Sequence, residues 1–213
     1  MAAEGVPAGE PEEVDVWVEP ICPWAWLVSR WMLEVQRVRP VRARWHVMSL
    51  YCLNEGKEVE RKYRKFRHFL DASFGAVRVF AAARQKCGPE CTLPLYEAMG
   101  RRVHLDQRPL VDRPLIQESL AEAGLPGELA EFADRTDYDE LARASHDEAI
   151  ALVGDEVGAP VVRWRTAAFF GPVVSPAPRG EQAGRLWDAC TTLAGVDGFY
   201  ELKRRRDRGP VFG

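Results

Sequence analysis

The first part of the chain has the hydrophobic pattern of a strand, a helix and a second strand. The apolar run from Val14 to Val18 ends at Pro20, which is typical of a short strand buried on both faces. Apolar residues then recur at helical spacing, which predicts an amphipathic helix of about four turns that begins near Pro23. Alternation from Val41 to Val47 predicts a second strand, parallel to the first.

The remainder of the chain predicts a helical insertion and then a hairpin and a closing helix. Residues 55–138 are helical in pattern, with separate helices expected near 58–70, 114–123 and 127–133. Two short strands, Val161 to Trp164 and Ala167 to Phe170, are separated by two residues and precede an amphipathic helix over 183–193. This order predicts an α/β fold that carries an α-helical subdomain, with residues 1–13 as a disordered tail.

Composition excludes several classes of function. The 213 residues contain 29 Lys and Arg against 32 Asp and Glu, a net charge of −3 that does not suit a nucleic-acid or membrane-surface binder. Neither a transmembrane stretch nor a signal peptide is apparent, so we expect a cytoplasmic protein. Five cysteines, an odd number, are then expected to be reduced thiols.

Cys22 is the strongest candidate for a reactive group. It lies where the first strand ends and the first helix begins, beside unpaired amides and the positive end of the helix dipole. Such a position stabilises a thiolate and therefore predicts a lowered pKa for Cys22 and a good leaving group in disulfide exchange.

Several blocks of sequence, in one order, resemble the actinobacterial DsbA-like proteins typified by the mycothiol-dependent nitroreductases. The resemblance extends from about Val14 to Arg205. Its blocks are Pro20 to Trp26, Ser29 to Trp31, His46 to Leu50, Leu53 to Glu55, Ala98 to Gly100 with His104, Ala168 to Val173, Pro178 to Glu181 and Leu186 to Asp188.

The resemblance implies a thioredoxin-like fold (βαβ … ββα) with a large inserted α-helical subdomain. The two halves of the thioredoxin-like domain would be residues 14–54 and 139–200. The helical insertion would be residues 55–138, and a basic C-terminal tail, 201–213, would follow. It implies a cis peptide bond between Ala159 and Pro160 that faces the catalytic Cys22. It also implies mycothiol or another low-molecular-weight thiol as co-substrate. Residues that would bind this thiol or a small-molecule substrate are Pro23, Trp24, Asn54, Tyr63 and His104.

Two departures from the family pattern change the expected chemistry. Ala25 replaces the second cysteine of Cys-Pro-Trp-Cys, and Ala159 replaces the usual threonine before the proline. An external thiol would have to resolve any mixed disulfide on Cys22, which predicts a monothiol oxidoreductase. Two alternatives stay open: a thiol-assisted isomerase or transferase, as in kappa-class glutathione transferases, and a redox-inactive binding protein.

The other cysteines suggest no metal site. Cys87 and Cys91 lack a second ligand pair at zinc spacing, so we expect two loop thiols, with a disulfide as the alternative. Cys52 and Cys190 are expected in the core, and neither is expected to resolve Cys22, although Cys52 is the better candidate of the two. The basic run from Lys203 to Arg206 is interpreted as a solvated helix end. Substrate identity and oligomeric state are left open.

Overall fold

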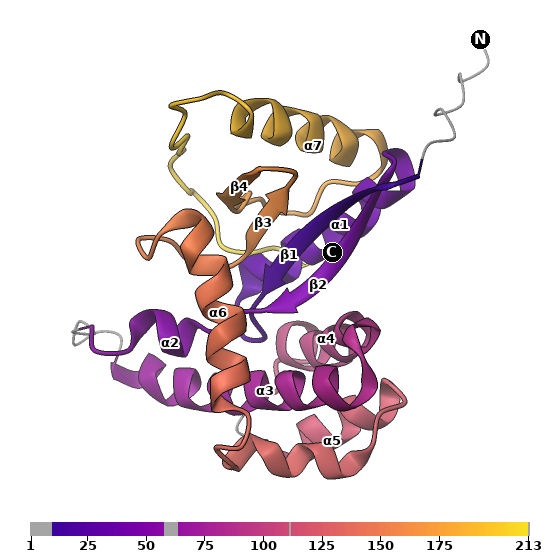
Figure 1. The fold of residues 1–213 in the computed structure, drawn as a ribbon, viewed down its shortest axis with the longest axis vertical. Helices are drawn as coiled ribbons and strands as arrows, with labels where there is room; N and C mark the ends of the chain where they lie inside the picture. The colour runs from indigo at the N-terminus through magenta and orange to yellow at the C-terminus, as the bar shows by residue number, and fades with distance from the viewer. Residues whose placement is uncertain (1–9, 58–63, 111, 213) are drawn as a thin grey trace.

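A computed structural model describes residues 10–57, 64–110 and 112–212 (Figure 1). Its elements in chain order are β1 (Glu12–Val18), α1 (Pro23–Val38), β2 (Val41–Val47), α2 (Leu50–Asn54), α3 (Arg64–Cys87), η2 (Pro89–Cys91), α4 (Thr92–Gly100), η3 (Arg101–Leu105), α5 (Arg113–Glu122), η4 (Gly127–Asp134), α6 (Asp139–Val153), β3 (Val161–Trp164), β4 (Ala167–Phe170) and α7 (Gly180–Ala194).

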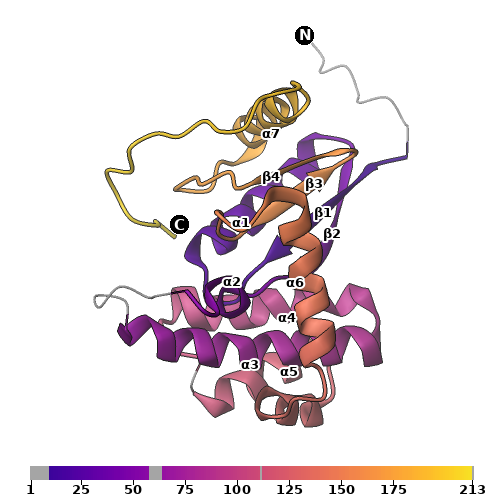
Figure 2. The same cartoon turned by 60° about the vertical axis from the view of Figure 1, so that its left-hand side comes forward.

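The strands form one mixed sheet in the order β2-β1-β3-β4. β1 is parallel to β2 and antiparallel to β3, and β3 is antiparallel to β4. Helices α1 and α7 pack together beside the sheet, and α3, α4 and α5 gather into a separate helical layer at its lower end (Figures 1 and 2). The thioredoxin-like βαβ … ββα order with an inserted helical subdomain is therefore present.

The predicted strands are present, with two local differences. β1 begins at Glu12, two residues inside the predicted tail, because the Glu12 amide donates to Pro40 O at 2.8 Å and its carboxylate accepts from Trp164 Nε1 at 2.6 Å. The β3-β4 turn contains no glycine, and Arg165 instead adopts the left-handed conformation, φ 54°. Both details extend the pairing of the sheet.

The helical region differs more from its prediction. α3 continues to Cys87, well past the expected end near residue 70, because apolar residues at helical spacing keep one face buried from Leu70 to Ala83. The segment expected as a helix over 127–133 is a 3₁₀ helix, η4. Helix α6 was not separately predicted, because its buried positions are mostly Ala and His, which give a weak apolar pattern.

A buried carboxylate clamps the three central strands. Asp15 of β1 is 3% exposed and lies opposite Arg44 of β2 and Arg163 of β3. Its oxygens accept hydrogen bonds from Arg44 Nε at 2.9 Å, from Arg163 Nη2 at 2.6 Å and from His46 Nε2 at 2.8 Å. Although burial opposes ionisation, these bonds together hold the pKa of Asp15 well below its ordinary value.

We expect Asp15→Asn to lower the free energy of unfolding at pH 7 by about 3 kcal/mol, because the arginines lose their carboxylate. The wild-type contribution is present above the unfolded pKa of Asp15, 3.8, and is lost as pH falls through the lower folded value. Urea unfolding at pH 7 and pH 3 measures both effects. Glu13→Gln, at a half-exposed carboxylate that also pairs with Arg44, is the control and should change stability by less than about 1 kcal/mol.

Candidate active site around Cys22

The Cys22 thiol lies at the start of α1, below the carboxyl end of β1. Cys22 is the residue preceding the helix, in an extended conformation (φ −80°, ψ 111°), and Pro23 occupies the first helical turn. Proline suits this position, because the first-turn amides have no partner within the helix. The sequence thus directs a sulfur toward the positive end of a helix of 16 residues.

The loop before β3 faces this sulfur. Cys22 Sγ donates to the carbonyl oxygen of Ala159 at 3.3 Å, and the Ala159–Pro160 peptide bond is cis. Ala159 is 3% exposed. The structure thus brings Cys22 next to Ala159 and Pro160, which lie 137 residues or more further along the chain.

Burial opposes ionisation of Cys22 in this conformation. The side chain is 6% exposed, and desolvation raises the pKa of Cys22 to about 12. The backbone amides of Ala25 and Trp24 act in the opposite direction, but the nearby carboxylate of Glu19 raises the pKa further. The lowered pKa predicted for Cys22 from the helix dipole is therefore wrong for this structure, because loss of hydration outweighs the dipole.

Glu19 is an ionisable group that sequence reasoning missed. Its side chain is fully buried, and its oxygens accept hydrogen bonds from Ile21 N at 2.9 Å and from the hydroxyl of Ser73 on α3. Burial raises the pKa of Glu19 to about 7 despite these bonds. The available signal was a charged residue at the end of an apolar strand, three positions before Cys22.

Two groups from the helical subdomain complete the site. Tyr96 of α4 is fully buried, and among the described residues its hydroxyl has no hydrogen-bond partner. His104 of η3 lies 3.0 Å from Pro20 O through Nε2, and because a carbonyl only accepts, this nitrogen carries the proton. Burial lowers the pKa of His104 to about 4, so the ring is neutral at pH 7. The subdomain therefore reaches the thiol loop with neutral donors.

Close packing fixes α4 against α1. The ring of Trp26 lies 5.6 Å from that of His104 and 6.0 Å from that of Tyr96. A Cβ at Gly100 would lie 2.5 Å from Trp26 ring atoms, so only glycine fits there. This contact sets the position of the helical subdomain beside the thiol.

The remaining predicted site residues are placed differently. Trp24 is half-buried and contacts the C-terminal segment, with Arg206 Cζ 5.4 Å from its ring centroid. Asn54 ends α2, and its amide donates to Leu50 O at 2.7 Å. Within the described chain, Asn54 forms no hydrogen bond with Cys22 or Trp24. Tyr63 lies outside the described residues.

Comparison with known proteins decides the family. The family model described as "Rv2466c-like: Mycothiol-dependent nitroreductase Rv2466c" matches residues 21–204. The chain belongs to the Rv2466c-like family. It is also 26% identical over 200 residues to the uncharacterized protein Rv2286c of Mycobacterium tuberculosis (strain ATCC 25618 / H37Rv), a match that covers 93% of this chain and 84% of that protein.

Solved structures show that this Rv2466c-like protein has a DsbA-like thioredoxin fold. The "probable DsbA oxidoreductase SCO1869 from Streptomyces coelicolor" superposes with a TM-score of 0.60 at 16% identity, and the match covers 94% of this chain and 93% of that one. The cytosolic disulfide reductase DsbM from Pseudomonas aeruginosa superposes with a TM-score of 0.55 at 15% identity, over 85% and 100% of the two chains.

The other four cysteines of this Rv2466c-like chain form no hydrogen bond or disulfide with Cys22 in the described residues. Cys52 and Cys190 are half-buried rather than core residues, because they lie at helix surfaces that are only partly covered. Cys87 is exposed at the end of α3, and Cys91 is buried in η2, so these two thiols lie on helical elements and not in a loop. All five cysteines are free.

The described residues contain neither a cluster of metal-binding side chains nor a helix that could span a membrane. No group of three or more His, Cys, Asp or Glu side chains within them could hold a metal ion. None of the helices in the same part of the chain is long and apolar enough to cross a bilayer.

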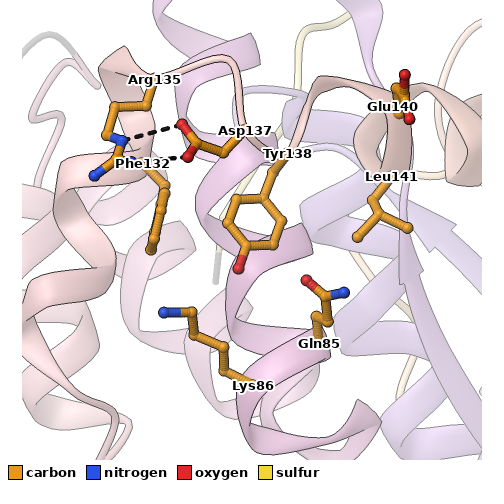
Figure 3. Close-up of a pocket in the computed structure, with 8 residues that line it drawn as sticks. All are labelled: Gln85, Lys86, Phe132, Arg135, Asp137, Tyr138, Glu140 and Leu141. Atoms are coloured by element: carbon orange, nitrogen blue, oxygen red, sulfur yellow. Dashed lines mark hydrogen bonds and ion pairs between the residues drawn. The ribbon is translucent and has the colours of Figure 1, made fainter.

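An open hollow of about 650 Å³ lies in the helical subdomain, away from the thiol. Figure 3 shows the Tyr138 ring between Lys86 and Asp137, with Asp137 paired to Arg135 at 2.7 Å. Its lining residues are Gln85, Lys86, Phe132, Arg135, Asp137, Tyr138, Glu140 and Leu141. None of the predicted site residues contributes to it, so the hollow is separate from the Cys22 site.

Proposed function

We propose that this protein is a cytoplasmic monothiol oxidoreductase that uses mycothiol as its co-substrate. The observation that carries the proposal is the placement of Cys22 at the start of α1, with its sulfur against the Ala159 carbonyl, in a chain of the mycothiol-dependent family. In this proposal the positive end of the α1 dipole and the backbone of the Ala159–Pro160 loop provide the groups that bind an incoming thiol.

The proposed reaction begins with loss of the Cys22 proton to solvent. The thiolate attacks one sulfur of a disulfide, the disulfide bond breaks, and a mixed disulfide forms on Cys22 as one thiolate leaves. Mycothiol thiolate then attacks the outer sulfur, which restores Cys22 and yields a disulfide that contains mycothiol. One mycothiol is consumed, one thiol is released and Cys22 is regenerated, so the net reaction is a thiol–disulfide exchange in which the number of disulfide bonds stays the same. Trp24 and the Ala159–Pro160 backbone are proposed to bind the incoming thiol.

Burial of Cys22 favours the alternative that the protein is a redox-inactive binding protein. A thiol whose pKa is raised to about 12 is a poor nucleophile, which would suit a redox-inactive binding protein. The experiment below separates the two, because only a reactive thiol forms an adduct.

We expect Cys22 of the reduced protein to gain one mycothiol on incubation with mycothiol disulfide. Ala25→Cys should convert this adduct into an internal disulfide. The new thiolate would attack Cys22 Sγ and release mycothiol, because Ala25 lies one helical turn from Cys22 and its fully buried site accepts a small thiol. Intact mass spectrometry follows both species. Ala25→Ser is the matched control and should keep the adduct; absence of any adduct on the wild-type chain overturns the proposed function.

A further inference from the structure

The chain after α7 returns to the thiol site as an extended segment. Residues 195–212 contain no helix or strand, and Figure 2 shows this yellow segment leaving α7 and running back toward α1. We call residues 203–212 the C-terminal strap. The predicted helix end for its basic residues is wrong, because α7 stops at Ala194 and Gly195 follows it.

Two ring contacts hold the strap near Cys22. The Arg206 guanidinium lies 5.4 Å from the ring centroid of Trp24, within cation–π range. Further along, the Phe212 ring lies 5.8 Å from His104, which in turn bonds Pro20 O. Trp24 is two residues after Cys22 and Pro20 is two residues before it, so the strap contacts one flanking residue directly and the other through His104.

A clamp on the loop after β4 holds the end of the strap. Ser175 Oγ accepts from Val211 N at 2.8 Å and donates to Gly209 O at 3.3 Å. Phe212 is half-buried and packs against the core. The middle of the strap is exposed by contrast, so its charged side chains remain available to a ligand.

The strap carries a concentrated positive charge in a chain that is acidic overall. Residues 201–208 contain five basic and two acidic residues, so their net charge is +3. Many arginines elsewhere in the described chain pair with carboxylates, as Arg39 pairs with Asp188 at 2.6 Å. In the part of the chain that the structure describes, Lys203, Arg204 and Arg205 have no such partner.

We propose that the C-terminal strap is an anion-binding element of the Cys22 site, so that the site prefers substrates that carry a carboxylate or phosphate group. The inference rests on the proposed function, because it assigns a substrate class to the same thiol. Guanidinium groups bind these anions through paired hydrogen bonds. A positive strap above a partly apolar site also attracts anions from solution and raises their local concentration.

Two disulfide probes of different charge test the strap. Dithiobis(nitrobenzoate) is a dianion and dithiodipyridine is neutral. With each, the Cys22 thiolate attacks one sulfur, the probe disulfide breaks and one aromatic thiolate leaves. Intact mass and peptide mapping give the rate at Cys22, and the exposed thiol of Cys87 gives an internal reference.

Arg204→Gln/Arg206→Gln should lower the ratio of anionic to neutral probe rates at Cys22 about fivefold at low salt, and 0.5 M salt should lower the wild-type ratio by about the same factor. The control variant Arg37→Gln/Arg42→Gln removes the same amount of charge. Arg37 is in the last turn of α1, at the end far from Cys22, and Arg42 is near the start of β2, so this variant should change the ratio less than about twofold. An unchanged ratio in the strap variant overturns the inference and leaves the proposed function standing. No reaction of Cys22 with either probe overturns both.

Discussion

Cys22→Ser is expected to take up no mycothiol at residue 22 and to lose all thiol-dependent activity. A serine hydroxyl keeps the hydrogen bond that Cys22 donates to the Ala159 carbonyl, so the loop before β3 should stay in place. The hydroxyl ionises far less readily than a thiol and forms no disulfide, so the reaction has no starting nucleophile. Peptide mapping by mass spectrometry after incubation with mycothiol disulfide measures the loss at residue 22, and circular dichroism verifies the fold.

Cys87→Ser provides the comparison for this result. Cys87 is exposed at the end of α3 and is the most accessible of the five thiols, so it competes for any reactive disulfide. The Cys87→Ser protein should keep its adduct on Cys22 and its activity. If activity instead disappeared with Cys87 and survived loss of Cys22, the proposed role of Cys22 would be wrong.

Glu19→Gln is expected to change the pH dependence of stability by about 3 kcal/mol. The carboxyl pKa is 4.5 in the unfolded chain and about 7 in the folded protein, so the folded state binds more protons between these values. Stability from the protonated carboxyl is therefore fully present below pH 4.5 and is lost as pH rises through 7. Glutamine is neutral and should remove this loss. Urea unfolding at pH 5 and pH 8 gives the difference for both proteins.

The same substitution should increase the reactivity of Cys22 at pH 8. Ionised Glu19 raises the pKa of Cys22, so its removal should move the alkylation midpoint of Cys22 to lower pH. Glu156→Gln, at an exposed carboxylate, is the matched control. It should change neither the difference in unfolding free energy between pH 5 and pH 8 nor the pH midpoint of Cys22 alkylation. An unchanged pH dependence of unfolding in Glu19→Gln would contradict the assignment of a raised pKa to Glu19.

Local sequence patterns predicted the elements that carry the thiol. The strand from Val14 to Val18, the helix that begins at Pro23 and the hairpin around Arg165 all follow from residues close together in the chain. Cys22 at the strand-helix junction could be identified in the same way. The contact between Cys22 and Ala159 could not be obtained from spacing alone, and it entered as an expectation through the family resemblance.

Tertiary placement explains what the sequence did not predict. Glu19 becomes an unusual acid only because Ser73 and the helical subdomain bury it, and no local pattern encodes that burial. The basic run from Lys203 to Arg206 has the sequence pattern of a helix end, but in the structure it belongs to an extended segment that contacts Trp24. The raised pKa of Cys22 has the same origin, since the helix dipole is local whereas burial depends on distant segments.

Ala25 determines how the proposed thiol exchange would respond to the size of the mycothiol pool. With one reactive sulfur, each exchange consumes one thiol and produces one disulfide, so the fraction of protein in the mixed-disulfide form depends on the ratio of these two species. A two-cysteine site would consume two thiols and would depend on the square of the thiol concentration. A tenfold dilution of the whole pool at constant ratio would therefore leave this protein unchanged, and would shift a two-cysteine relative by about tenfold toward oxidation.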